Sequence, residues 1–352
     1  MLVLDGSYGE GGGQIVRSAL SLAALTGRSV RLENIRANRP KPGLRPQHLT
    51  AVRALAAVTG GTLRGAELGA TSLTFAPQGI FPGTYRFDVA QQTGSAGAVT
   101  LLAQTLLPVL AFAPGPSSLL LLGGTHVPWS PPFHYLAWVF LPALRQLGLA
   151  ATAEIRRWGF YPRGGGEVYL HLTPVTRMQG VDWTTPPAPT AFQGLSAAAN
   201  LPEHVVRRQS QTLREHLAWP LTIREEKPQS PGPGSFVFLW GPQAGFSALG
   251  AKGKPAEQVA LEAVQAFQDF CKAAAGVDRH LADQILLYAA LATGLTTLRT
   301  EAITLHLLTN IWVIRQFLEV SIEVQGDLQH PGTIRVQGLG YRSGRLWQQR
   351  GG

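Results

Sequence analysis

A glycine-rich turn near the start of the chain carries a glutamate where phosphate chemistry could occur. Residues 5–14 read Asp-Gly-Ser-Tyr-Gly-Glu-Gly-Gly-Gly-Gln, between an expected strand at 2–5 and an expected helix at 14–26. Backbone N–H groups at a helix start favour an anion, and glycines let that backbone come close. Glu10 would repel a phosphate unless Mg²⁺ or Mn²⁺ lay between them. The turn has neither the lysine of a P-loop nor the third glycine of a dinucleotide fingerprint. It favours a metal-assisted phosphate site, with a plain turn and a solvated glutamate as the alternative.

A basic loop follows at 35–48. It holds Arg36, Arg39, Lys41 and Arg45 among prolines. Prolines reduce the entropy lost on ordering, so the cations can be preorganised. Such a loop could bind the phosphates of RNA or ATP. A solvated basic loop is the alternative.

A third segment, 123–135, combines prolines with aromatic residues at an expected strand-to-helix turn. Rigid rings of this kind could form the walls of a base-binding slot. Ordinary packing of an exposed turn explains the same residues.

His306 lies at another expected strand-to-helix junction. A lone histidine is most often structural. A neutral imidazole can, however, attack phosphorus and form a phosphoramidate that passes its group on. Asp283 and Gln284, expected to begin a further helix, could bind ribose or base edges.

The elements that must position these residues alternate between strand and helix. Expected elements at 2–5, 14–26, 30–36, 46–59, 72–76 and 85–90 form a β-α-β-α-β-β unit. Segment 13–20 resembles 283–290, segment 48–52 resembles 306–311, and a third helix runs from Gly94-Ser95-Ala96-Gly97 to Pro108. We interpret these similarities as three copies, roughly 1–90, 91–180 and one containing 278–340. Chance similarity between apolar helices is the alternative.

The composition changes between 184 and 275. This stretch begins with a proline-rich linker at 184–189, holds four of the five lysines, and has the pattern strand, helix, strands, helix. We expect a small α/β domain inserted into the third copy. The predicted fold is α+β, with a large domain at 1–183 and 276–340, the insert at 184–275 and a tail at 341–352.

Composition limits the classes of protein that remain. The 352 residues are 45% hydrophobic and 14% charged, with a net charge of +9, and 25 of the 30 basic residues are arginine. An arginine excess suits a nucleic acid or nucleotide partner, although a GC-rich genome also favours arginine codons. With one cysteine, the chain contains no internal disulfide. The sequence shows no signal peptide pattern. Prolines interrupt the most apolar stretch, which excludes it as a membrane span. We expect a cytoplasmic protein without a membrane span.

Taken together, the motifs resemble the RNA 3′-terminal phosphate cyclase family. The resemblance covers nearly the whole chain and rests on the 5–14 turn, Ile-Arg-Ala-Asn-Arg-Pro-Lys-Pro-Gly-Leu at 35–44, and four shorter motifs at 94–97, 159–166, 281–284 and 306–310. It implies three repeats like the C-terminal domain of a bacterial translation initiation factor. It also implies a thioredoxin-like domain within the third repeat.

The resemblance implies a reaction in three steps. Histidine takes AMP from ATP, AMP passes to an RNA 3′-phosphate, and the neighbouring 2′-hydroxyl displaces AMP to leave a 2′,3′-cyclic phosphate. By position, His306 is similar to the nucleophile and Glu10 to the ligand of Mg²⁺ or Mn²⁺. Phosphate contacts and the nucleotide pocket are implied for the following residues: Arg17, Arg36, Arg39, Gln104, Pro131, Tyr135, His280, Asp283 and Gln284.

Two positions depart from the family pattern, and two other functions stay open. Position 280 is histidine instead of an adenine-stacking tyrosine, which puts ATP affinity or base preference in question, and His126-Val127 replaces a polar or acidic residue.

A non-catalytic cyclase-like protein acting in ribosomal RNA maturation would lack the histidine nucleophile. A plain RNA-binding module leaves Glu10 in its turn unexplained. The oligomeric state is open, with a homodimer as one possibility.

Overall fold

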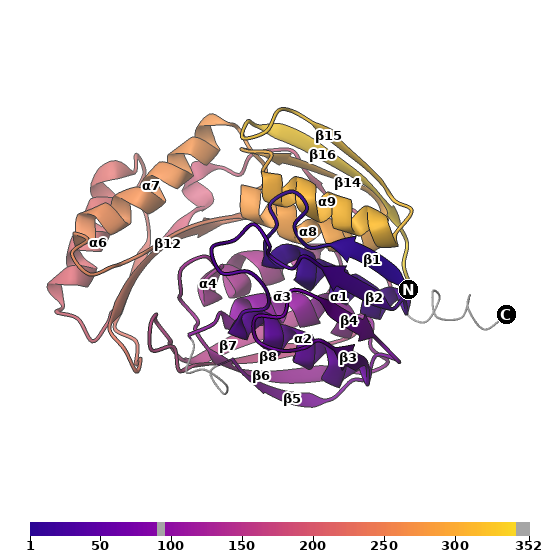
Figure 1. Ribbon diagram of the computed structural model, residues 1–352. Helices are drawn as coiled ribbons and strands as arrows, with labels where there is room; N and C mark the ends of the chain where they lie inside the picture. Colours follow the sequence, from indigo (N-terminus) through magenta and orange to yellow (C-terminus); the bar gives the residue numbers. More distant parts are fainter. Residues whose placement is uncertain (90–95, 343–352) are drawn as a thin grey trace.

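Four four-stranded sheets and the helices packed on them form the part of the chain that the computed structural model describes, residues 1–89 and 96–342 (Figure 1). Three of these sheets have the same strand order. In each, the first strand is parallel to the second, and the fourth strand lies antiparallel between the second and the third. The architecture is therefore mixed α+β.

The first sheet has the order β1-β2-β4-β3. Its helix α2 begins with Pro46, whose missing N–H is not needed in a first turn, and ends before Gly60 in the left-handed conformation. The predicted bounds 46–59 are confirmed. The elements of this unit are β1 (Leu2–Asp5), α1 (Gly13–Thr26), β2 (Val30–Glu33), α2 (Pro46–Thr59), β3 (Thr62–Arg64) and β4 (Leu73–Ala76).

The second sheet has the order β5-β6-β8-β7. After β6 the chain enters a continuous helical segment that passes through one π-helical turn. The elements of this second unit are β5 (Thr84–Asp88), α3 (Val99–Leu110), β6 (Ser117–Gly123), α4 (Phe133–Tyr135), η1 (Leu136–Phe140), α5 (Leu141–Gln146), β7 (Ala151–Arg157) and β8 (Gly166–Leu172).

The third sheet has the order β15-β16-β14-β9. Its short first strand is separated from the rest by the segment 184–275. Its elements are β9 (Asp182–Trp183), α8 (Arg279–Leu291), β14 (Thr293–Thr300), α9 (Leu305–Phe317), β15 (Ser321–Gln325) and β16 (Gly332–Leu339).

Helices meet in the centre, and the three sheets cover them from outside (Figure 1). Helix α1 contacts α2, α3 and α9, while α8 contacts α9 and α3. Nearly every side chain of α1 from Ile15 to Thr26 is buried, as expected for a helix surrounded by others. This packing brings the start of α1, the start of α9 and the middle of α8 together.

Three sequence expectations need correction. The strand expected at 85–90 does not close the first unit: β5 pairs with β6 and opens the second sheet, because strand pairing depends on distant partners. The strand β3 was not predicted at all. The expected strand at 30–36 ends at Glu33, since Asn34 and Arg36 adopt positive φ angles. Residues 94 and 95 of the small-residue turn, and 343–352 of the tail, lie outside the described residues.

The segment 184–275 has the predicted order of strand, helix, strands and helix. Its sheet has the order β11-β10-β12-β13, and α6 packs against α7. After the short 3₁₀ turn η2 (Pro189–Ala191), its elements are β10 (Gln193–Ala199), α6 (His204–His216), β11 (Ile223–Glu226), β12 (Gly234–Gly241), β13 (Ala244–Leu249) and α7 (Ala256–Lys272).

Strand β12 shows how this sheet is buried on both faces. Val237 and Leu239 join the core formed with α6 and α7. Phe236, Phe238 and Trp240 point to the other face and join the core of the large domain. One face of the insert's sheet therefore belongs to the core of the large domain, and the other face forms a separate core with α6 and α7. None of the helices in the described residues is long and apolar enough to span a bilayer.

Candidate active site

His306 lies in the first turn of α9, which Thr304 caps by accepting a hydrogen bond from the Leu307 N–H at 3.0 Å. The imidazole Nδ1 is 2.8 Å from Oδ2 of Asp283, a buried carboxylate on α8. An Nδ1–H donated to Asp283 leaves the lone pair of a neutral imidazole on Nε2. The carboxylate therefore fixes the ring and selects the tautomer that can act as a nucleophile.

Charge around His306 alters its titration. Burial lowers the pKa of His306, but the carboxylates of Asp283 and Glu10 outweigh burial and hold the pKa above its ordinary value. The same charges stabilise a positive imidazole, which is the form that results when Nε2 bonds to phosphorus.

Glu10 lies on the other side of the imidazole. Its Oε2 is 3.6 Å from Nε2 of His306, and its Oε1 forms an ion pair with Arg39. The Glu10 N–H donates to the Thr309 hydroxyl on α9 at 3.0 Å, so the glycine turn is docked directly on the histidine helix. At Gly9, with φ of +56°, an added Cβ would lie 2.3 Å from that hydroxyl. The close approach therefore requires glycine.

The donor set near His306 suits a cation shared with a phosphate. No group of three or more His, Cys, Asp or Glu side chains arranged for a metal exists in residues 1–89 and 96–342. Mg²⁺ typically binds through one or two carboxylates and completes its shell with substrate phosphates and water. Glu10 alone, facing the cleft, fits that kind of site.

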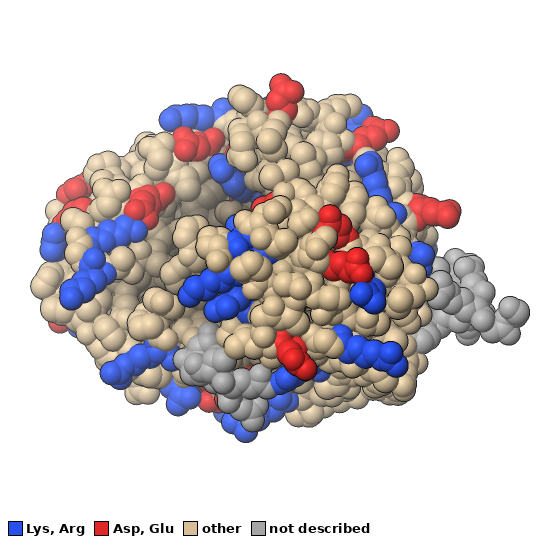
Figure 2. All heavy atoms as spheres, in the orientation of Figure 1, with Lys and Arg blue, Asp and Glu red and all other residues tan. Residues whose placement is uncertain are grey.

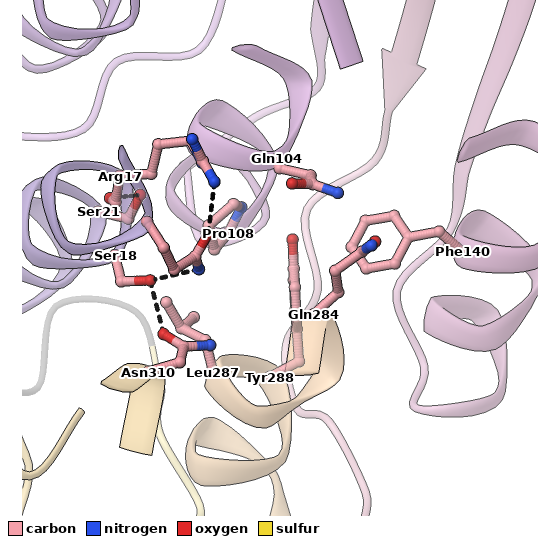
Figure 3. A pocket seen from close by; sticks show the side chains of 11 residues that line it. Arg17, Ser18, Ser21, Gln104, Pro108, Phe140, Gln284, Leu287, Tyr288 and Asn310 are labelled. Carbon is pink, nitrogen blue, oxygen red and sulfur yellow. Dashed lines mark hydrogen bonds between the residues drawn. The ribbon is translucent and has the colours of Figure 1, made fainter. Parts of the chain in front are cut away.

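Arg17 lies in the floor of the site. Its Nη2 donates to Oε1 of Gln14 at 2.6 Å, while its Nε is buried and has no hydrogen-bond partner among the described residues. Burial lowers the pKa of Arg17 to about 10, so the guanidinium stays charged at neutral pH. Figure 3 shows this side chain beside Gln104 and Gln284 at a small cavity of about 30 Å³. The cavity is large enough for a single water molecule.

A cleft of about 1610 Å³ opens above this floor, between the large domain and helix α7 of the insert. It brings together every residue for which the family resemblance implied a role in the site, from six separate stretches of chain. The residues are Glu10, Arg17, Arg36, Arg39, Gln104, Pro131, Tyr135, His280, Asp283, Gln284 and His306. Their individual roles remain predictions.

Several of these side chains have partners that sequence reasoning did not anticipate. The Tyr135 hydroxyl donates to both carboxylate oxygens of Asp278 at 2.9 Å, so it is not available to a ligand. Arg36 donates to the carbonyls of Lys41 and Gly43 at 2.6 and 3.1 Å and thereby closes the basic loop. Arg36 is thus partly structural.

The sequence motifs did not indicate Asp278 as a residue of the site. Its carboxylate accepts the N–H groups of His280 and Leu281 at the start of α8, and the N–H of Gly245 from the insert at 3.0 Å. Burial, with the nearby Glu301, raises the pKa of Asp278 to about 7. Because this cap starts α8 at Arg279, Asp283 and Gln284 lie in its second turn and do not begin the helix as expected.

His48 is a second residue whose place was missed, although its similarity to His306 in the repeat comparison was a signal. It is buried at the third position of α2 and lines the cleft. Burial, with Arg17, Arg36 and Arg45 nearby, lowers its pKa to about 3. His48 is therefore a neutral imidazole at physiological pH.

The segment 123–135 divides into two parts. Trp129, Ser130, Pro131 and Pro132 line the cleft, as the base-slot interpretation expected of this turn. His126 is buried elsewhere: it stacks on Trp158 with ring centroids 4.0 Å apart, and its Nε2 is 2.8 Å from Nδ1 of His134. The departure from the family pattern at His126 therefore affects packing against Phe236 of the insert and not the cleft wall.

Comparison with known proteins identifies the family. Residues 8–324 match the family model described as RNA 3'-terminal phosphate cyclase. The chain belongs to the RNA 3′-terminal phosphate cyclase family. The matched range includes every candidate site residue and the whole insert, so the predicted family membership is confirmed.

Relatives of the same name match almost end to end. The RNA 3'-terminal phosphate cyclase of Pyrobaculum neutrophilum is 43% identical over 350 residues, covering 96% of this chain and 99% of the relative. That of Thermococcus onnurineus is 44% identical over 349 residues, with 96% and 99% covered. That of Pyrococcus furiosus is 41% identical over 343 residues, with 96% and 98% covered. These matches identify the chain as an enzyme of the cyclase family.

Among solved structures, the enolpyruvyl transferase NikO from Streptomyces tendae aligns with 96% of this chain and 48% of its own length. The TM-score is 0.42 and the sequence identity is 13%.

Proposed function

We propose that this enzyme uses ATP to convert an RNA 3′-phosphate into a 2′,3′-cyclic phosphate, through a His306–AMP intermediate and an RNA adenylate. The observation that carries the proposal is the setting of His306. Its Nδ1 is bound by Asp283, and its Nε2 faces a cleft that holds Glu10 and the arginines.

In the first step, Nε2 of His306 forms a bond to the α-phosphorus of ATP as the bond to pyrophosphate breaks. The imidazole becomes positive, and the Asp283 carboxylate, 2.8 Å from Nδ1, stabilises it. Arg17 and Arg39 supply positive charge for the departing pyrophosphate. A bound Mg²⁺ or Mn²⁺ at Glu10 would neutralise phosphate charge in this region.

In the second step, an oxygen of the RNA 3′-phosphate bonds to the AMP phosphorus and His306 leaves as neutral imidazole. In the third, the 2′-hydroxyl bonds to the RNA phosphorus, AMP departs, and the hydroxyl proton is released. A phosphate monoester has a poor leaving group. Once the phosphate is joined to AMP, AMP becomes the leaving group and departs readily. The 2′-hydroxyl is already within reach, so ring closure is intramolecular.

The nucleotide would lie along Gln104, Pro131, His280 and Gln284. Oδ1 of Asp283 and Oε1 of Gln284 are buried acceptors without a partner in the described part of the chain. Buried acceptors of this kind are costly unless a ligand or water satisfies them, so they suit ribose hydroxyls or the adenine amino group. His280 is exposed on the cleft wall, where its imidazole can stack on a base.

The three sheets of like order support a finer description of the fold. The units at 1–76, 84–172 and 182–339 are repeats of one βαβαββ element, like the C-terminal domain of a bacterial translation initiation factor. The insert at 184–275 has a thioredoxin-like arrangement, and the large domain spans 1–183 and 276–340. The single cysteine and an RNA substrate fit a cytoplasmic enzyme.

The test is incubation of the wild type and His306→Ala with α-³²P-ATP and Mg²⁺ or Mn²⁺, followed by denaturing electrophoresis. An acid-labile, base-stable label on the wild type alone is the expected result. Label retained on His306→Ala would show that another residue is the nucleophile. No label on a folded wild type would favour the non-catalytic relative.

A further inference from the structure

Trp129 is the most exposed large apolar side chain among the described residues. It is 99% accessible, and it lies on the wall of the cleft that contains His306. The base-slot interpretation covers the whole turn at 123–135, but the residues that the family resemblance assigns to the nucleotide pocket do not include Trp129. The ring therefore needs an explanation that the adenylylation step does not give.

The loop around Trp129 is built to hold the ring outward. Trp129 adopts a φ of +65°, which costs a non-glycine residue of order 1 kcal/mol or more and is concentrated at functional sites. On either side of it the backbone is held, because the Ser130 hydroxyl donates to the Val127 carbonyl at 3.0 Å and the Thr100 hydroxyl to the Pro131 carbonyl at 2.7 Å. A preorganised ring loses little entropy when it binds a partner.

A second exposed aromatic residue is attached to the same loop. The N–H groups of Thr125 and His126 both donate to the Gly159 carbonyl, and the Gly159 N–H donates to the Thr125 hydroxyl, at 2.9 to 3.1 Å. Two residues beyond Gly159 lies Tyr161, which is 66% accessible. The motif 159–166 that pointed to the family is thus bonded to the start of the segment 123–135, and it carries a second exposed ring.

Arginines flank Tyr161 in the sequence and line the same cleft as Trp129. Arg163 is exposed two residues after Tyr161, and Arg157 is exposed two residues before Gly159. On the cleft side, Arg36 and Arg39 line the wall. Burial lowers the pKa of Arg36, and the nearby charges of Arg39 and Arg45 lower it further. Figure 2 shows blue side chains gathered along the hollow between the insert and the large domain.

The cleft is also larger than one nucleotide requires. Pockets for ligands of nucleotide size measure about 300–1,000 Å³, and this cleft measures about 1610 Å³. The cleft therefore has room for more of a substrate than one nucleotide.

We propose that Trp129 and Tyr161 form a stacking surface for the bases that precede the reacting 3′ end of a single-stranded RNA. Aromatic rings with nearby arginines bind single strands by stacking and by phosphate contacts, with little dependence on sequence. The proposal rests on the proposed function, because it extends from the cleft in which the 3′-phosphate would react. It assigns a site for RNA upstream of that phosphate, which the chemistry alone does not need.

The experiment separates this proposal from the proposed function. Self-adenylylation of each protein is first measured with ATP and no RNA, which tests the His306 chemistry and folding. Affinity and cyclisation are then measured on 3′-phosphorylated oligouridylates from the dinucleotide to the decamer. The proteins are wild type, Trp129→Ala, Trp129→Phe, Tyr161→Ala and, as control, Leu295→Ala, which truncates an exposed side chain on β14.

For the wild type we expect affinity to rise with oligonucleotide length. Trp129→Ala should lose about 5- to 150-fold in affinity for the longer RNAs, the range measured for one stacked base, while the dinucleotide changes less. Tyr161→Ala should show a smaller loss confined to the longest RNAs, and Trp129→Phe should restore most of the affinity. Leu295→Ala should match the wild type.

Salt dependence distinguishes stacking from charge. Trp129→Ala should leave the slope of log affinity against log salt unchanged, whereas Arg163→Gln should reduce it by about 0.7 if it contacts one phosphate. The proposal is overturned if Trp129→Ala binds all lengths like the wild type. It is also overturned if adenylylation and RNA binding fall equally, which would assign Trp129 to ATP. Absence of adenylylation in the wild type would instead refute the proposed function.

Discussion

The Nδ1 of His306 on α9 lies 2.8 Å from Oδ2 of Asp283 on α8, and these two helices come from opposite sides of β14 in the sequence. The contact fixes the ring so that Nε2 is the only nitrogen available to phosphorus. Asp283→Asn would keep the side-chain shape but remove the charge that favours this tautomer and stabilises the imidazolium. We expect adenylylation to slow by about 10²- to 10⁴-fold, the range seen when such partners are removed. Single-turnover labelling with ATP measures the effect.

The same pair sets the pH dependence of labelling. The carboxylates raise the pKa of His306, so in the wild type the rate should fall as pH decreases through a value above the ordinary histidine pKa. Asp283→Asn removes a raising charge, so its acid limb should move to lower pH. An unchanged limb would show that another group controls the titration. Rates of labelling across a pH series, with nucleotide saturating, decide between these results.

Glu10 offers a test of the metal-assisted phosphate site. Glu10→Gln keeps the size of the side chain but weakens its hold on a cation and on Arg39. We expect adenylylation to fall about 100-fold and to need more Mg²⁺ or Mn²⁺, while RNA affinity changes little. Arg53→Gln, on the exposed surface of α2, serves as a matched control. Equal loss of labelling and RNA binding would point to a role in folding.

The contact between Gly9 and Thr309 predicts a paired rescue. Gly9→Ala would place a Cβ 2.3 Å from the Thr309 hydroxyl and would impose a left-handed backbone on alanine, so the turn carrying Glu10 must move. Labelling should fall at least 10-fold, since small displacements of catalytic groups are costly. Adding Thr309→Ala should recover part of the loss by removing the clash. The recovery should be incomplete, because the backbone penalty of about 1 kcal/mol remains.

Asp278 predicts a stability effect of defined sign. Asp278→Ala would remove a helix cap and leave the Tyr135 hydroxyl and the Gly245 N–H unpaired, at about 2–5 kcal/mol in total. In the wild type, burial raises the pKa of this carboxyl from 3.8 to about 7. Its protonation therefore stabilises the fold below pH 3.8, and that contribution is lost as pH rises through about 7.

The isosteric variant Asp278→Asn is uncharged at every pH, so its Tm should vary less between mildly acidic and neutral solution than that of the wild type. Thermal unfolding followed by circular dichroism at several pH values is the measurement. A wild-type Tm that rises steadily over this range, with no difference from Asp278→Asn, would contradict the assignment.

The sequence predicted what depends on neighbours in the chain. Pro46 and Gly60 define α2 by local conformational preference, and the strand-helix alternation indicated the α+β class. The motifs that resemble one family selected residues that the structure places in a single cleft.

What the sequence did not predict depends on distant partners. Whether the strand at 84–88 ends one sheet or begins the next is decided by β6, more than 30 residues away. The start of α8 depends on a cap whose carboxylate also binds Tyr135 and Gly245. Nothing local to Trp129 distinguishes a ring that packs inward from one held in solvent.

The alternation along β12 has a consequence for how this enzyme could have evolved. Because Phe236, Phe238 and Trp240 are part of the large-domain core while Val237 and Leu239 serve the insert's own helices, neither part has a finished surface without the other. An insert transplanted into another protein would expose three aromatic rings, and a large domain without the insert would expose the apolar side chains that those rings cover. Substitutions on the buried face of the insert's sheet and on the large-domain residues that it covers are therefore expected to occur together. The insert is an integral part of this enzyme and not an exchangeable module.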